Sequence, residues 1–127
     1  MQAMRASILL SQDDAGNREL AAEVLRAEGW EVVAIAGPPT LDLVRTHVPS
    51  AIVLDGHDAV FLRELRASPA FGTTPVALWT ASALGPEAIA ALEQEFAPLA
   101  VVQKPMTMPE LPEAIRLLLA GGTSSGA

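Results

Sequence analysis

Short apolar runs alternate five times with amphipathic stretches along this chain. Each run holds five or six residues with few polar interruptions, which is the pattern of a strand buried on both faces. Strands are therefore expected at SILLS (7–11), EVVAIA (31–36), AIVLD (51–55), PVALWT (75–80) and LAVVQ (99–103). Strands that alternate with helices in this way predict a doubly wound α/β fold, in which a parallel sheet carries helices on both faces.

The stretches between these runs have helical spacing and carry helix start or stop signals. Helices are expected over 17–29, 38–48, 60–67, 86–96 and 109–120. In the first of them, Leu20, Val24 and Leu25 are expected to share one face, and Gly29 is a stop signal. The second is expected to begin at its two prolines, because proline is favoured in the first turn of a helix.

Composition limits the domain count and the classes of partner. The chain has 127 residues, half of them apolar, which is enough for one compact core. We expect one domain over 1–120, followed by a flexible tail or the start of a linker over 121–127. A net charge of −7 argues against binding to nucleic acid or to an anionic membrane. The chain contains no cysteine, and no charged region is followed by a long apolar run. We therefore expect neither a signal peptide nor a membrane span, and a cytoplasmic location.

Polar residues collect where the predicted strands end. They are Gln12, Asp13 and Asp14 after the first strand, Asp55 at the end of the third, Thr80 at the end of the fourth and Lys104 after the fifth. In a doubly wound fold these carboxyl ends share one edge of the sheet, where ligands bind. Converging carboxylates require a cation, and Mg²⁺ suits oxygen ligands. A hydroxyl and an ammonium can then bind an anion, so the pattern predicts a phosphoryl-transfer site.

Simpler roles are open for several of these residues. Asp14 and Asp58 are also suited to capping a helix, and Thr80 alone is a good strand former. Asp55 is harder to explain by solubility, because it closes an apolar strand in the middle of the sheet. Lys104 is the only lysine beside seven arginines, which favours a position where one compact charge must reach an anion.

Four segments together resemble the receiver domain of two-component response regulators. They are ILLSQDD…NREL, AIVLD, PVALWTA and VVQKP, and the resemblance spans roughly residues 6–120. It implies five strands in the order 2-1-3-4-5, with Asp55 as the phosphoryl acceptor. It also implies that Asp13, Asp55 and the main-chain carbonyl of His57 hold Mg²⁺, with Asp14 as a further candidate ligand. Thr80 would contact a phosphoryl oxygen, and Lys104 would pair with the phosphoryl group.

The resemblance implies a signalling protein rather than an enzyme acting on a separate substrate. Its phosphoryl group would come from a histidine kinase or a histidine phosphotransfer protein. The resulting conformational change would control a downstream partner or an output domain. A receiver-like interaction module that works without phosphorylation is an alternative, and a small-molecule binder with flavodoxin-like topology is another.

The sequence departs from the receiver pattern at three places. Gln12 stands where the first acid of the usual acidic pair is expected, which predicts weaker binding of Mg²⁺. The segment after Asp55 reaches its helix early, and Val101 replaces an aromatic residue three places before the lysine.

The segment that begins at Asp55, DGHDAV, also resembles the start of a cobalamin-binding signature. That signature belongs after a first strand, and Val60 stands in place of its glycine.

Overall fold

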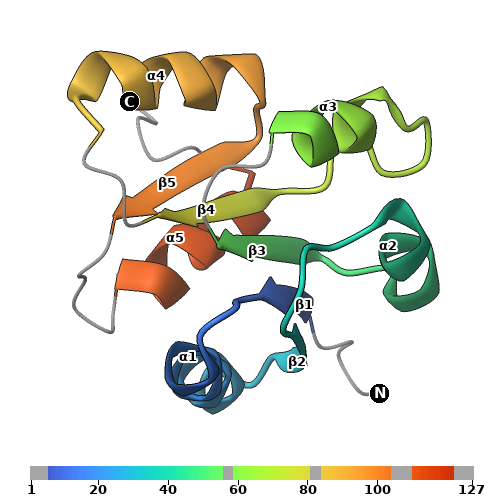
Figure 1. Cartoon of the computed structure of the whole chain (residues 1–127), viewed down its shortest axis with the longest axis vertical. Helices are drawn as coiled ribbons and strands as arrows, with labels where there is room; N and C mark the ends of the chain where they lie inside the picture. The colour runs from blue at the N-terminus through green and yellow to red at the C-terminus, as the bar shows by residue number, and fades with distance from the viewer. Residues whose placement is uncertain (1–5, 56–58, 81–83, 104–109, 122–127) are drawn as a thin grey trace.

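Five parallel strands form one sheet in the part of the chain that the structure describes. This computed structural model describes residues 6–55, 59–80, 84–103 and 110–121. The strands are β1 (Ser7–Ser11), β2 (Glu31–Ile35), β3 (Ala51–Asp55), β4 (Val76–Thr80) and β5 (Leu99–Gln103). Their order is β2-β1-β3-β4-β5 (Figure 1), which confirms the expected fold class and topology.

The helices cover both faces of the sheet. They are α1 (Ala15–Ala27), α2 (Leu41–His47), α3 (Ala59–Ala67), α4 (Pro86–Glu95) and α5 (Glu110–Leu119). Buried side chains of α1 and α5 pack on one face of the sheet, and those of α2 and α3 pack on the other. Figure 1 shows α1 and α5 in the lower part of the view and α3 and α4 in the upper part. The early helix after Asp55 is confirmed, because α3 begins at Ala59.

The central strands are buried on both faces, as their unbroken apolar sequence predicts. All five residues of β4 and the first four of β3 are buried, whereas the edge strand β2 is only partly covered. No helix within the described ranges is long and apolar enough to cross a membrane.

Two expectations about the helices are wrong. Leu20 is 44% exposed, and the buried face of α1 consists of Ala21, Ala22 and Leu25. Residues five apart lie about 140° apart around a helix, so Leu20 cannot share a face with Leu25. The second helix begins at Leu41 rather than at the prolines, because the Thr40 hydroxyl accepts a hydrogen bond from a backbone N–H of its first turn.

Arg66 on α3 connects the two segments that lead into β4 and β5. Its guanidinium donates hydrogen bonds to the carbonyls of Phe96 (2.9 Å), Pro98 (2.8 Å), Thr74 (2.7 Å) and Gly72 (3.4 Å). Desolvation by burial lowers the pKa of Arg66. No ion pair to a carboxylate accompanies it in the described part of the chain, so backbone carbonyls offset the cost of burying this charge.

Helix α4 is held on the edge of the sheet mainly by partly buried contacts. None of its residues is buried. The Glu93 carboxylate accepts a hydrogen bond of 3.3 Å from the backbone N–H of Val101 on β5. Because β5 is an edge strand, this N–H points away from the sheet toward α4, and the carboxylate gives it a partner.

Replacing Glu93 by alanine is expected to loosen α4 from β5 while leaving the sheet folded. The loss should amount to about 1 kcal/mol of local stability, since the Val101 N–H then has only water as a partner. Amide hydrogen exchange should accelerate at Val101 and along α4. Glu95→Ala is the matched control on the same helix, because the Glu95 side chain is more than half exposed. Equal exchange in both variants would show that Glu93 does not hold the helix.

Candidate functional site

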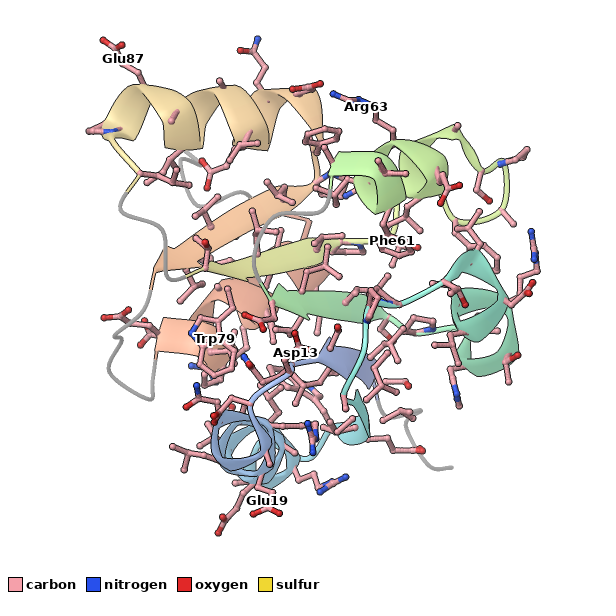
Figure 2. All side chains as sticks on the ribbon, viewed as in Figure 1. Asp13, Glu19, Phe61, Arg63, Trp79 and Glu87 are labelled. Carbon is pink, nitrogen blue, oxygen red and sulfur yellow. The ribbon has the colours of Figure 1, made fainter. Side chains whose placement is uncertain are left out.

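The ends of β1 and β3 bring two carboxylate residues together. Asp55 is the last residue of β3 and is half-buried, and Asp13 lies two residues beyond β1. The backbone N–H of Asp13 donates a long hydrogen bond, 3.4 Å, to Oδ2 of Asp55. Figure 2 labels Asp13 where the chain leaves β1 for α1. The backbone of Asp13 therefore lies beside the Asp55 carboxylate, at the edge of the sheet that the sequence predicted.

Strand β4 brings Trp79 and Thr80 to the same edge of the sheet. Trp79 pairs in register with Asp55, and Thr80 is the next and last residue of the strand. Both side chains are buried, with Thr80 only 2% exposed. Figure 2 shows Trp79 close to α5 and to the β1 end that carries Asp13. Thr80 is thus placed at the strand end that the sequence predicted, whereas its contact with a phosphoryl oxygen remains a prediction.

Asp14 caps helix α1. Its carboxylate Oδ2 accepts a hydrogen bond of 2.7 Å from the backbone N–H of Asn17, and its backbone has the extended conformation of an N-cap residue. The capping role that the sequence left open is confirmed. A role for Asp14 in binding metal stays a prediction, and one of its oxygens is already occupied.

Gln12 is buried, with 1% of its surface exposed. Its side-chain Oε1 accepts a hydrogen bond of 3.1 Å from the backbone N–H of Asp14. Its Nε2 is buried and has no hydrogen-bond partner among the residues that the structure describes. The sequence identified Gln12 only as a missing acid and did not predict that its amide would be buried.

Arg18 is a further residue of this region that sequence reasoning missed. From the first turns of α1, its Nη1 donates hydrogen bonds to the main-chain carbonyls of Gln12 (2.9 Å) and Asp13 (3.3 Å). These bonds fix the segment that carries Asp13 and place a cation near two acids, where it offsets part of their repulsion. The sequence did offer a signal for this role, namely an arginine early in the helix that follows an acidic strand end.

The donor set in the described residues fits a hard divalent cation. Asp13 and Asp55 are close in space and carry oxygen ligands, and Mg²⁺ is commonly bound by one or two carboxylates with several waters. No cluster of three or more histidine, cysteine, aspartate or glutamate residues occurs in the described ranges. His57 and Lys104 lie outside them, so the predicted carbonyl ligand and the predicted ammonium remain predictions.

Comparison with solved structures identifies the fold. The chain superposes on the chemotaxis protein CheY4 of Vibrio cholerae with a TM-score of 0.76 and 19% identity, covering 91% of this chain and 99% of that one. A response regulator from Chloroflexus aurantiacus gives a TM-score of 0.76 and 25% identity over 92% of this chain and 99% of that one. No family model and no curated protein matches the sequence.

A third solved structure adds to the same group. The signal receiver domain of a LuxO repressor protein from Vibrio parahaemolyticus gives a TM-score of 0.77 with 19% identity, over 93% of this chain and 92% of that one. The chain therefore has the fold of CheY-like receiver domains, and the resemblance read from its four sequence segments is confirmed at the level of fold.

Proposed function

We propose that this chain is a phosphoacceptor receiver domain that is phosphorylated on Asp55. One observation carries the proposal: in a receiver fold, Asp55 closes the central strand β3 and is hydrogen-bonded to the segment that presents Asp13. The phosphoryl donor is a histidine kinase or a histidine phosphotransfer protein. The modified domain changes conformation and so controls a downstream protein or an output domain.

The proposed reaction is a phosphoryl transfer to a carboxylate. An oxygen of Asp55 attacks the phosphorus of a phosphohistidine, an O–P bond forms, and the P–N bond breaks. The bonding electrons remain on the imidazole nitrogen of the donor. Asp13, Asp55 and the main-chain carbonyl of His57 would hold Mg²⁺, which supplies positive charge against the transferring phosphoryl oxygens. Thr80 donates a hydrogen bond to one of those oxygens, and Lys104 pairs with the phosphoryl group.

The experiment that tests this function is incubation with acetyl phosphate and Mg²⁺, followed by intact mass measurement. We expect a gain of one phosphoryl mass, and none when the metal is removed with a chelator. An unchanged mass with Mg²⁺ present would favour the second candidate, a receiver-like interaction module that needs no phosphorylation. The buried amide of Gln12 in place of a carboxylate is the observation that favours this candidate.

Gln12→Asp is expected to lower the Mg²⁺ concentration needed for half-saturation by about tenfold. An additional carboxylate beside Asp13 and Asp55 raises the negative charge available to a hard cation. Tryptophan fluorescence, to which Trp79 opposite Asp55 contributes together with Trp30, reports the titration. An unchanged titration would show that Asp14 already serves as the additional acid despite capping α1.

A further inference from the structure

Gln12 lies on the same face of the sheet as Asp55. Strands β1 and β3 pair Leu10 with Val53, and both side chains belong to the core on the α1–α5 face. Side chains alternate along a strand, so two residues further on, Gln12 comes level with Asp55 on that face. The backbone N–H of Gln12 still bonds to Ile35 of β2 at 3.1 Å, so the chain is held beside the sheet at this point.

Trp79 on β4 lies on the same face of the sheet as Gln12 and Asp55. It pairs in register with Asp55, and its side chain belongs to the same core. Neighbouring strands are about 4.8 Å apart, a distance that a glutamine side chain can span. An acceptor attached to Asp55 is therefore within reach of the Gln12 amide.

The orientation of the Gln12 amide is determined by its one hydrogen bond. Oε1 accepts from the N–H of Asp14, and exchanging the two amide atoms would set two donors against each other. The NH₂ group must then be the end that has no partner among the described residues. Since a buried donor without an acceptor is costly, this arrangement calls for an acceptor that arrives with a ligand or a modification.

We propose that Gln12 Nε2 donates a hydrogen bond to an oxygen of the phosphoryl group carried by Asp55, so that Gln12 selects the phosphorylated form of the site. The inference rests on the proposed function. A phosphoryl group brings three strong acceptor oxygens and close to two negative charges. A carboxylate at position 12 would repel these charges, whereas an amide attracts them. Compared with an acid at this position, Gln12 thus lowers the affinity of the site for the metal and raises its affinity for the phosphoryl group.

Two variants separate this role from a structural one. Gln12→Glu keeps an oxygen that can accept from the Asp14 N–H and replaces only the NH₂ group. Gln12→Met keeps the length of the side chain without a donor, an acceptor or a charge. Beryllofluoride at saturating Mg²⁺ is the phosphoryl mimic, and the change in tryptophan fluorescence reports its binding. Both variants should bind it at least about tenfold more weakly than the parent chain. Repulsion alone would weaken binding only in Gln12→Glu, so parental affinity in Gln12→Met overturns the inference.

NMR of the parent chain provides a second test, in which binding of the mimic is read from the Gln12 amide itself. It contains four glutamines and one asparagine, so few side-chain NH₂ signals appear in its ¹H–¹⁵N NMR spectrum. The pair of NH₂ signals that is absent from the spectrum of Gln12→Glu belongs to Gln12. Addition of beryllofluoride with Mg²⁺ should shift this pair downfield, while the pair of Gln94, an exposed residue on α4, stays in place.

The outcomes distinguish the inference from the proposed function. If acetyl phosphate adds a phosphoryl mass but the Gln12 pair does not move with the mimic, Asp55 is the acceptor and the role of Gln12 is refuted. If neither labelling nor binding of the mimic occurs, the proposed function fails, and the inference fails with it.

Discussion

Asp55→Asn should abolish the mass gain that acetyl phosphate produces in the presence of Mg²⁺. An amide has no carboxylate oxygen to attack phosphorus, and it also removes one of the two acids expected to hold the metal. The loss should be complete rather than graded. The fold should persist, because asparagine has nearly the same shape and because Asp55, half-buried beside Asp13, gives up a repulsive charge. Intact mass and thermal unfolding, measured on one preparation, separate these two effects.

Asp14→Asn is the matched control for that variant. Asp14 lies one residue from Asp13, yet its carboxylate caps α1 by accepting from Asn17, and asparagine caps a helix equally well. This variant should be labelled like the parent chain. Labelling that persists in Asp55→Asn would contradict the assignment of Asp55 as the acceptor. Loss of labelling in Asp14→Asn would show instead that Asp14 also helps to hold the metal.

The sheet could be predicted because its signal is local. An unbroken apolar run such as AIVLD marks a strand buried on both faces, and the structure places β3 at the expected residues. The edge where Asp13 and Asp55 meet followed from the same pattern, since the carboxyl ends of parallel strands lie together. Leu20 was misplaced because two small residues, Ala21 and Ala22, form the close contact between α1 and the sheet. Alanine gives a weak signal in a hydrophobic pattern.

The missed features depend on how the folded chain places side chains, which no periodic pattern in the sequence reports. Arg18 and Arg66 look like ordinary helix-surface arginines in the sequence, and only the folded chain shows which carbonyls their guanidinium groups reach. Gln12 is buried only in the folded chain, where its backbone N–H bonds to the carbonyl of Ile35 on β2. A polar side chain that becomes buried through tertiary packing leaves no periodic pattern to detect.

Arg66→Met is expected to destabilise the fold more than any other single change at an arginine of α3. The variant keeps much of the aliphatic stem but removes four donated hydrogen bonds, to Phe96, Pro98, Thr74 and Gly72. These carbonyls lie in the segments that lead from α3 into β4 and from α4 into β5. Loss of a shared, partly buried cation from such a position should cost about 2–4 kcal/mol in the free energy of unfolding. Urea denaturation measures this loss directly.

Arg63→Met is the matched control, because Arg63 lies on the same helix with a side chain 65% exposed and a single 4.0 Å contact to Glu95. It should change the free energy of unfolding by less than about 0.5 kcal/mol. Arg66→Lys should lie between the two, since one ammonium keeps the charge but cannot reach all four carbonyls in both segments at once. If Arg66→Met were as stable as Arg63→Met, the carbonyls would be satisfied by water at no cost, and Arg66 would not be what holds these segments together.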